Sequence, residues 1–257
     1  MDKVAIITGA ARGIGLATAK IFLQQNYKVV IVDRDKNEVN KLKLKNDKLL
    51  KYICDISDPK KNKSMIEDIY KWGKRIDILV NNAGVADFGK IETVKFKNWR
   101  KIMDTNLDGT FLTAQNVIKY LKKTKGNIIN IASISGLRAS TLRIAYGTSK
   151  AAIIQLTQQQ AIELGEFGIR VNCVSPGPVK TKLAQAVHTP DIVKAYHDSI
   201  PLNRYGMENE IAEAIFFLSS EKASYITGQN LSVDGGFEAY GVVIISLREG
   251  KSILIKQ

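Results

Sequence analysis

Short apolar segments alternate with longer segments of helical period along most of the chain. Apolar residues three to four positions apart predict helices near 13–26, 36–45, 60–72, 96–123, 147–166 and 209–219. The short apolar segments predict seven strands, at 4–8, 28–33, 49–54, 77–82, 127–133, 169–175 and 230–234. These segments are rich in valine and isoleucine and lack polar alternation, which is typical of a parallel sheet covered on both faces. We therefore expect an α/β fold whose ligand site lies at the carboxyl ends of the strands.

Length and composition favour one domain. The chain has 257 residues, 45% of them hydrophobic, and contains no linker rich in proline, glycine or serine. The apolar run in MDKVAIITGA is too short for a signal peptide, and no window approaches the roughly 18 apolar residues of a membrane span. We therefore expect a cytoplasmic protein without a membrane partner. Cys54 and Cys173 lie in apolar segments without a Cys-x-x-Cys motif, so we interpret both as core residues and predict no metal site.

The net charge of +13 invites an interpretation as a nucleic-acid-binding protein. The excess is confined to residues 1–130, which carry 26 Lys and Arg against 14 Asp and Glu, whereas residues 131–257 carry 12 against 11. It consists mainly of lysines, as in KLKLKNDKLLK (41–51) and KKNK (60–63), without interleaved aromatic residues for base stacking. We therefore interpret these lysines as a solvated surface and predict no nucleic-acid partner.

The first predicted strand ends in TGAARGIG (8–15), a glycine-rich turn that leads into a helix. Glycines there let the backbone approach a pyrophosphate at the helix N-terminus, where free N–H groups and the helix dipole favour anions. A plain strand-to-helix turn is the alternative, but Asp33 follows 18 residues after Gly15, at the end of the second strand. Its carboxylate is placed to accept hydrogen bonds from ribose hydroxyls and to repel a 2′-phosphate. We therefore predict a dinucleotide site that prefers NAD, with NADP less favoured although Arg12 and Arg34 lie nearby.

Two Tyr-x-x-x-Lys pairs occur, Tyr146–Lys150 in AYGTSK and Tyr70–Lys74 in DIYKWGK. A phenol ordinarily loses its proton near pH 10, so a tyrosine base near neutrality needs its phenolate stabilised by roughly 4 kcal/mol. A cation about 4 Å away supplies roughly that free energy at an effective dielectric near 20, and residues i and i+4 share a helix face. Tyr146 opens a helix after a strand-end loop, where ligand sites lie. Tyr70 instead occupies an apolar helical position and is expected to fill the core, with Gly73 ending that helix before Lys74.

With these motifs the chain resembles the short-chain dehydrogenase/reductase family, and the resemblance extends over residues 2–240. The motifs appear in the family's order: TGAARGIG, NNAG (81–84), Asn106 in DTNLDG, Ser133 in NIASISG, YGTSK, SPGPVKT (175–181) and ITGQNLSVDGGF (226–237). The 3-oxoacyl-reductase and glucose-dehydrogenase branches are the most similar in pattern. The resemblance implies one catalytic domain, 1–240, with a Rossmann-like, doubly wound sheet of seven parallel strands, followed by a tail at 241–257. It also implies an oxidoreductase that interconverts a secondary alcohol and a ketone by hydride transfer, assembled as a homo-oligomer of two or four copies.

The resemblance further implies roles for individual residues. Tyr146 is expected to be the general acid/base, Lys150 to stabilise its phenolate and hold the nicotinamide ribose, Ser133 to bind the substrate oxygen, and Asn106 to anchor a water of the proton relay. Taken alone, Ser133 would be a strand-end turn residue and Asn106 a helix-distorting polar residue. The cofactor contacts expected besides Tyr146 and Lys150 are Gly9, Arg12, Gly13, Ile14 and Gly15 at the pyrophosphate, Asp33 at one ribose, Asp55 and Ile56 at the adenine, Asn82, Ala83 and Gly84 at the nearby ribose, and Pro176, Gly177, Val179 and Thr181 at the nicotinamide amide.

The substrate is expected to contact residues 134–145 and the segment 180–206, a polar stretch that suits a lid over the cleft. Arg138 and Arg143 could meet an anionic substrate, while polyols or sugars, steroid-like compounds and simple secondary alcohols are open as well. A 3-oxoacyl-(acyl-carrier-protein) reductase is the alternative, although Phe167 stands in EFGIRVN where that enzyme often has a basic residue. A catalytically silent dinucleotide-binding protein is the remote alternative, but it would lack the tyrosine or the lysine, and both are present.

Overall fold

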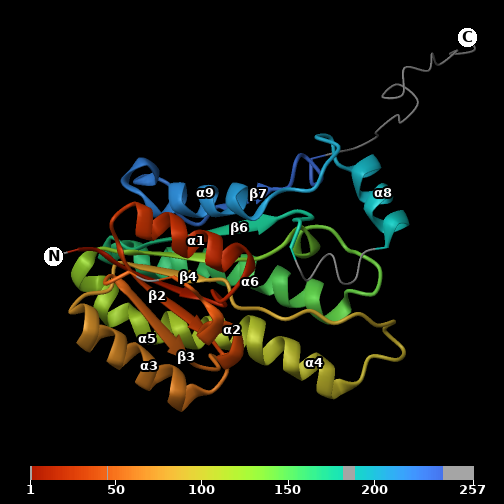
Figure 1. Cartoon of the computed structure of the whole chain (residues 1–257). Helices are drawn as coiled ribbons and strands as arrows, with labels where there is room; N and C mark the ends of the chain where they lie inside the picture. Colours follow the sequence, from red (N-terminus) through yellow and green to blue (C-terminus); the bar gives the residue numbers. More distant parts are fainter. Residues whose placement is uncertain (1, 45, 182–188, 240–257) are drawn as a thin grey trace, which may run out of the picture.

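The computed structural model describes residues 2–44, 46–181 and 189–239. Its centre is a sheet of strands in the order β3-β2-β1-β4-β5-β6-β7, and every neighbouring pair is parallel (Figure 1). The strands are β1 Val4–Thr8, β2 Lys28–Asp33, β3 Leu49–Ile53, β4 Ile78–Asn81, β5 Asn127–Ile131, β6 Arg170–Pro176 and β7 Asn230–Val233. Each lies within two residues of a strand predicted from the apolar pattern. The expected Rossmann-like, doubly wound sheet of seven parallel strands is therefore confirmed.

Helices cover both faces of this sheet (Figure 1). Successive strand residues point to opposite faces, so Val4 and Ile6 of β1 pack in one core cluster, and Ala5 and Ile7 pack in the other. The Val4 cluster includes residues of α3 (Pro59–Gly73), α5 (Gly109–Thr124) and α6 (Ile144–Leu164). The Ala5 cluster includes residues of α1 (Gly13–Gln24) and α9 (Glu208–Ser219). Further elements among the described residues are α2 (Lys36–Lys41), α4 (Phe96–Met103), α8 (Pro190–Ser199) and 3-10 turns at Ile134–Gly136, Gly165–Phe167 and Glu221–Ala223.

The prediction of one continuous helix over 96–123 is wrong. The structure divides this segment into α4, a π turn at Asp104–Asp108, and α5. Asn106 lies in the π turn, where its side-chain amide donates to the Val85 carbonyl (3.0 Å) and its side-chain oxygen accepts from the Val85 N–H (2.8 Å). This pair of hydrogen bonds joins the turn to the segment after β4. A π turn accommodates one extra residue in a helix, and such turns are frequent at functional sites.

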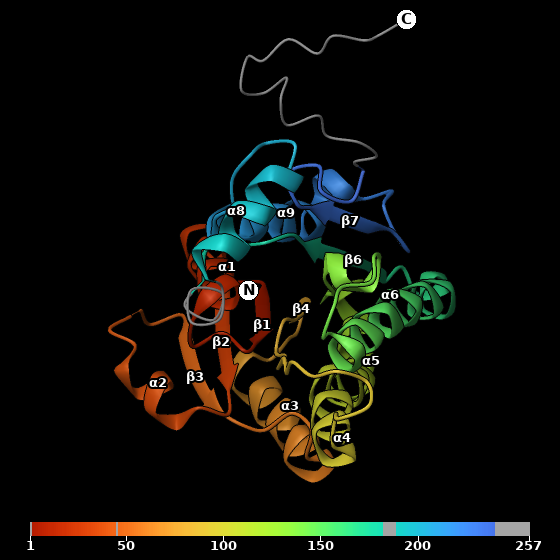
Figure 2. The ribbon, with the colours of Figure 1, turned by 90° about the vertical axis from the view of Figure 1, so that its right-hand side faces the viewer.

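The segment 180–206, predicted as a polar lid, contains a helix. Thr189 caps α8 because its side chain accepts a hydrogen bond from the Ile192 N–H, and Pro190 occupies the first turn. Figure 2 looks onto this end of the molecule, with α8 at the top and α4 at the bottom. Residues 182–188 of the expected lid and the tail 241–257 lie outside the described residues. The predicted helix 36–45 is shorter than expected, because Leu42 is extended and its carbonyl accepts a hydrogen bond from the Lys51 ammonium at 2.7 Å.

Tyr70 packs in the core, as the sequence predicts. Its ring stacks on Tyr120 with the two centroids 4.3 Å apart. Helix α3 ends at Gly73, and Lys74 follows in the left-handed conformation with φ 60°. Cys54 and Cys173 are buried and free, and burial raises the pKa of both thiols to about 11. In the described part of the chain, no helix is both long and apolar enough to cross a membrane, and no group of three His, Cys, Asp or Glu residues could hold a metal ion.

Thr8 holds the ends of β1 and β4 together. Beyond β1 the sheet continues in one direction through β2 and β3, and in the other through β4 to β7. The buried Thr8 hydroxyl accepts hydrogen bonds from the N–H groups of Asn82 and Ala83, both at 3.0 Å, and donates weakly to the Val80 carbonyl at 3.4 Å. Open α/β sheets bind ligands where the strand order reverses in this way. Thr8 therefore holds in place the two strand ends at which the ligand site is expected.

Replacing Thr8 with Val should destabilise the fold. The substitution preserves the side-chain shape but leaves the partly buried N–H groups of Asn82 and Ala83 without this acceptor, so the free energy of unfolding should fall by about 2 kcal/mol. Urea denaturation followed by far-UV circular dichroism measures this change. Thr8→Ser is the matched control, because it keeps the hydroxyl and removes only a methyl group. A Val variant no less stable than the Ser variant would contradict the assigned role of the hydroxyl.

Candidate active site

The glycine turn after β1 is packed directly against the end of β4. Gly9 has φ 62°, and a Cβ atom there would lie 2.6 Å from the Ala83 Cα. A Cβ atom on Gly15 would lie 2.5 Å from both the Asn82 side-chain nitrogen and the Gly9 carbonyl oxygen. The Asn82 amide also donates to the carbonyls of Thr8 and Gly9, each at 2.9 Å. Both glycines are therefore required by close packing, and the turn is held rigidly in one position.

Helix α1 begins at this turn without a side-chain cap. Its N-cap residue, Arg12, is extended and makes no side-chain capping hydrogen bond, and the first turn of the helix contains no acidic residue. Gly13, with φ 62°, has its Cβ position open, since the nearest atom would be a Glu208 carboxylate oxygen 3.8 Å away. An uncapped helix N-terminus that opens onto a cavity suits an anion such as a pyrophosphate. The residues present therefore fit the phosphate portion of a dinucleotide.

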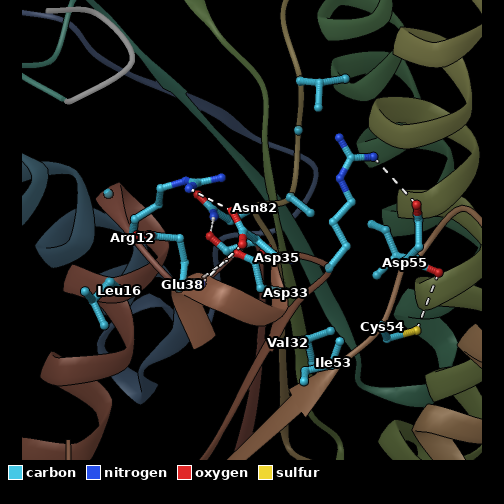
Figure 3. A pocket seen from close by; sticks show the side chains of 18 of the residues that line it. Arg12, Leu16, Val32, Asp33, Asp35, Glu38, Ile53, Cys54, Asp55 and Asn82 are labelled. Atoms are coloured by element: carbon cyan, nitrogen blue, oxygen red, sulfur yellow. Dashed lines mark hydrogen bonds and ion pairs between the residues drawn. The ribbon is translucent and has the colours of Figure 1, made fainter. Parts of the chain in front are cut away.

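A large cavity extends from this turn across the ends of β2 and β3, and we call it the glycine-turn cavity. Asp33, at the end of β2, accepts hydrogen bonds from the N–H groups of Ala11 (3.1 Å) and Asp35 (3.0 Å). Two backbone donors thus hold its carboxylate in place beside the glycine turn. Figure 3 shows Asp33, Asp35 and Glu38 gathered next to Arg12, with Asp55 on the other side of the same cavity. This part of the cavity is therefore rich in carboxylates.

The two arginines near Asp33 each form an ion pair with another carboxylate. Arg12 contacts Asp35 at 3.2 Å, and Arg34 contacts Asp55 at 3.6 Å. The Glu38 N–H, assisted by Arg12, lowers the pKa of the Asp35 carboxyl. Burial alone would raise the pKa of Asp55, but hydrogen bonds from Ser57 and the charge of Arg34 outweigh that effect and lower it. Both carboxylates are thus charged at neutral pH and compete with any phosphate for the arginines.

A second cavity lies beside the first, and we call it the tyrosine cavity. Its described lining includes Ser133, Tyr146 and Lys150, and it shares Ile14, Asn82, Gly84, Val85 and Thr181 with the glycine-turn cavity. Tyr146 and Lys150 both lie on α6, and the Lys150 ammonium is 5.7 Å from the centroid of the Tyr146 ring. Ser133 follows the end of β5, and its side-chain oxygen accepts a hydrogen bond from the Ser135 N–H. The two cavities together can hold an extended ligand.

Lys150 is a buried cation without an anionic partner. Only 5% of the residue is exposed, and its ammonium donates to the Ile131 carbonyl at 2.7 Å. Within the described ranges it forms no ion pair with a carboxylate. A buried charge is costly unless it is paired or hydrogen bonded, so a single carbonyl leaves much of the ammonium unsatisfied. The two remaining donors are available to a negative or polar group in the cavity.

Asn106 lies behind the cavity wall, outside the described lining of both cavities. Besides its pair of bonds to Val85, its amide donates to the Ser149 hydroxyl at 3.0 Å, and that hydroxyl donates to the Tyr146 carbonyl at 2.7 Å. A Cβ atom on Gly84 would lie 3.4 Å from the Asn106 side-chain oxygen and 3.5 Å from the Lys150 ammonium. The π turn is therefore linked to the start of α6, where Tyr146 and Lys150 are placed.

The structure brings nearly all the sequence-predicted site residues to these two cavities. Gly15 and Asn106 are the exceptions in the described lining, because Gly15 packs beneath the turn and Asn106 lies behind Gly84. Lining residues predicted for the cofactor are Gly9, Arg12, Gly13, Ile14, Asp33, Asp55, Ile56, Asn82, Ala83, Gly84, Tyr146, Lys150, Pro176, Gly177, Val179 and Thr181. Sequence reasoning missed Asp35, Glu38 and Phe88, which also line the cavities, whereas Tyr196 of the lining falls in the segment 180–206 that was expected to contact the substrate. Only Asp35 carried a signal, as a polar residue just before a predicted helix.

Comparison with known proteins gives matches over almost the whole chain. A family described as Enoyl-(Acyl carrier protein) reductase matches residues 9–238. A 3-oxoacyl-(acyl-carrier-protein) reductase FabG of Thermotoga maritima is 35% identical over 240 residues, covering 91% of this chain and 97% of that protein. An NAD-dependent glycerol dehydrogenase of Listeria innocua is 37% identical over 239 residues, covering 92% of this chain and 94% of that protein.

Solved structures agree with these matches. The ligand-free aldohexose dehydrogenase of Thermoplasma acidophilum has a TM-score of 0.87 at 33% identity, covering 95% of this chain and 96% of that one. A structure of ElxO with NADP bound has a TM-score of 0.87 at 31% identity, covering 93% of this chain and 100% of that one. This chain thus belongs to the short-chain dehydrogenase/reductase family and is an oxidoreductase that acts on CH–OH groups with NAD(P).

Proposed function

We propose that the protein is an NAD-preferring dehydrogenase that interconverts a secondary alcohol and a ketone, with Tyr146 as the general acid/base. The observation that carries this proposal is the tyrosine cavity, where the Tyr146 ring lies near the buried Lys150 ammonium and Ser133 belongs to the same lining. The tyrosine cavity suits a substrate, and the adjoining glycine-turn cavity, with its uncapped helix N-terminus, suits a dinucleotide. The catalytic domain is residues 1–240 by this proposal.

The residues divide the reaction between them. The Ser133 hydroxyl and the Tyr146 phenol hold the substrate oxygen, and the Tyr146 oxygen accepts the hydroxyl proton as the alcohol is oxidised. The ammonium of Lys150 stabilises the negative charge that develops on the Tyr146 oxygen, and its other donors hold the nicotinamide ribose. The dinucleotide supplies the hydride acceptor when it is bound. In the reverse direction Tyr146 returns the proton to the oxygen of the reduced ketone.

Asn106 serves in this proposal as a positioning residue for the proton path. Its bonds to Val85 and Ser149 hold the π turn against the start of α6, so that Tyr146 keeps its place relative to Ser133. A water anchored near Asn106 would connect Lys150 with solvent, since Gly84 leaves room between these two side chains. Protons released to Tyr146 could then leave the cavity without the substrate dissociating.

The carboxylates of the glycine-turn cavity support NAD over NADP. A 2′-phosphate on the adenosine ribose would meet Asp33, whose oxygens are held by two backbone donors and cannot turn away. The Arg12 and Arg34 side chains that could attract the phosphate are engaged by Asp35 and Asp55. Like charges at short range in a partly enclosed cavity repel strongly. The name of the glycerol dehydrogenase relative agrees with this preference, whereas the structure with NADP bound shows that family members also use the other cofactor.

A 3-oxoacyl-(acyl-carrier-protein) reductase is the second candidate, favoured by the 35% identity with the Thermotoga maritima enzyme. The measurement that separates the candidates is a panel of secondary alcohols, ketones and acetoacetyl thioesters, followed by nicotinamide absorbance with NAD and with NADP. We expect oxidation of small alcohols with NAD to exceed reduction of the thioesters. Preferential reduction of the thioesters with NADPH would favour the second candidate instead.

We also propose that the protein forms a homo-oligomer. Helices α5 and α6 expose large apolar side chains, with Phe111 45% and Ile162 83% exposed. Side chains of this size are commonly buried in subunit contacts. Light scattering coupled to size-exclusion chromatography should give two or four times the chain mass of 28.5 kDa. A single species at the chain mass would rule this out.

Replacing Tyr146 with Phe should abolish most turnover. The substitution removes the oxygen that transfers the proton, and general acid–base catalysis typically contributes about 10² to 10⁴-fold in rate, so kcat should fall by that order. The affinity for NAD should change little, because the ring still fills its position. Both quantities are accessible through nicotinamide absorbance and calorimetric titration with NAD.

The matched control is Tyr70→Phe, since Tyr70 belongs to the other Tyr-x-x-x-Lys pair and stacks on Tyr120 in the core. This variant should keep the wild-type kcat. If Tyr70→Phe lost activity while Tyr146→Phe kept it, the assignment of the acid/base would be reversed.

Replacing Asp33 with Ser should move cofactor preference toward NADP. The change removes the fixed negative charge beside the ribose and leaves Arg12 and Arg34 free to exchange their exposed ion pairs for a phosphate. The ratio of kcat/KM for NADP to that for NAD should rise by roughly 100-fold. Asp68→Ser is the control for net charge, because Asp68 binds Lys71 and Tyr52 on the outer surface, and its ratio should not move. Better efficiency with NADP in the unchanged protein would refute the NAD preference.

A further inference from the structure

The tyrosine cavity contains a second cation besides Lys150. Arg143 is the N-cap residue of α6, is partly buried, and lines the cavity. Its guanidinium carbon lies 4.0 Å from the centroid of the Phe88 ring and 5.3 Å from that of the Tyr146 ring. The positive charge is thus held against two aromatic rings, one of which belongs to the proposed acid/base. Any substrate that reaches Tyr146 passes close to this guanidinium.

The backbone around Arg143 holds it in this position. Residues Gly89 and Arg143 form a parallel bridge, and the Gly89 N–H donates to the Leu142 carbonyl at 3.1 Å. The Gly147 N–H donates to the Arg143 carbonyl at 2.7 Å, which starts the helix. Leu142 has φ 64°, a left-handed conformation that residues with a large side chain rarely adopt. The strained backbone at Leu142 directly precedes Arg143, which lines the cavity.

Arg143 has no carboxylate partner in the described part of the chain. Its guanidinium makes no hydrogen bond or ion pair there, and the described lining of the tyrosine cavity includes no Asp or Glu. Other arginines of this chain are paired, among them Arg12 with Asp35, Arg34 with Asp55, Arg75 with Asp77, Arg100 with Asp104 and Arg204 with Glu210. A guanidinium that is stacked on an aromatic ring and keeps its N–H donors free suits a planar carboxylate bound through two hydrogen bonds.

We infer that Arg143 binds a carboxylate of the substrate, and that the protein therefore acts on a short hydroxy acid and the corresponding keto acid. This inference rests on the proposed function, because it places the reacting alcohol at Tyr146 and Ser133. The short distance between the guanidinium and the Tyr146 ring requires that the carboxylate lie only a few bonds from the reacting carbon. Phe88 packs against the guanidinium and also lines the cavity, so it places an apolar surface beside the proposed carboxylate site.

The chemistry is unchanged by this choice of substrate. The carbinol carbon loses a hydride to the nicotinamide and the hydroxyl loses its proton to Tyr146, giving the keto acid and the reduced dinucleotide. The carboxylate takes no part in bond breaking and serves only to orient the reacting carbon.

A different role for Arg143 would give different kinetics. If its charge only stabilised the Tyr146 phenolate, removing it would slow every substrate by the same factor. If it binds a carboxylate, removing it must slow charged substrates far more than neutral ones of the same shape. Pairs of short 2- and 3-keto acids and their methyl esters separate these roles, because the esters keep the shape and lose the charge.

The experiment measures kcat/KM for each acid and ester with NADH in the wild-type protein and in Arg143→Gln, Arg143→Lys and Arg138→Gln. In the wild type we expect at least one acid to exceed its ester by roughly 100-fold. Arg143→Gln should remove most of that ratio, and Arg143→Lys should restore part of it. Arg138→Gln is the matched control, because Arg138 lies in the same segment but is exposed and outside the described lining of the cavity, so it should keep the wild-type ratio.

Equal activity on acids and esters in the wild type, or equal loss of both in Arg143→Gln, would overturn the inference while leaving the proposed dehydrogenase intact. A second readout does not depend on turnover. Ligand-observed NMR of butyrate and butyramide with the NAD-loaded protein should show binding of butyrate only, and Arg143→Gln should lose it. Binding of butyrate that is unchanged in Arg143→Gln would also overturn the inference. Failure of the proposed function would appear separately, as inactivity on neutral and charged substrates together with intact butyrate binding.

Discussion

The close contact between the glycine turn and the end of β4 is the constraint from which the site is built. Because Gly9 packs against Ala83 with no room for a side chain, the turn has one position, and α1 leaves it in one direction. The same turn places the Ala11 N–H where it binds Asp33, so the acidic end of β2 is positioned from β1 as well. Both the uncapped N-terminus of α1 and the position of the Asp33 carboxylate thus depend on a single packed junction between two central strands.

Electrostatics divide the cleft into two unlike halves. The glycine-turn cavity gathers carboxylates and engages its arginines with them, whereas the described lining of the tyrosine cavity has cations and no acids. Burying Lys150 at 5% exposure with a hydrogen bond to the Ile131 carbonyl costs folding free energy, and the proposed function gives this buried charge a use when the site is filled. Within the described lining, the cations that lack a carboxylate partner therefore lie in the cavity where chemistry is proposed, and the ion-paired arginines lie in the cavity where a dinucleotide is proposed to bind.

The sequence alone predicted the sheet and most of the lining of the site, for reasons that are local. Each strand is a short segment in which apolar residues predominate, and the glycine turn and the Tyr146–Lys150 spacing are contiguous motifs. Features that depend on contacts between residues distant in the sequence could not be predicted from local patterns. The π turn arises because Asn106 meets Val85, and the pairing of Arg12 with Asp35 arises from the meeting of two loops. Helix α8 is an exception, since Thr189 followed by Pro190 is a local start signal that the polar composition of the segment obscured.

The π turn also relates the number of residues between α4 and α5 to the direction in which their side chains point. One residue in an α-helix corresponds to a rotation of about 100°, and the π turn absorbs the rotation that one extra residue would otherwise cause, so that α4 and α5 both keep buried faces. Deleting a single residue between Asp104 and Asp108 would restore a regular helix with Val117 and Leu121 of α5 still facing the core, but it would remove the π turn in which Asn106 meets Val85. Chain length in this segment therefore governs whether the π turn forms, and with it the attachment of Asn106 to the segment after β4.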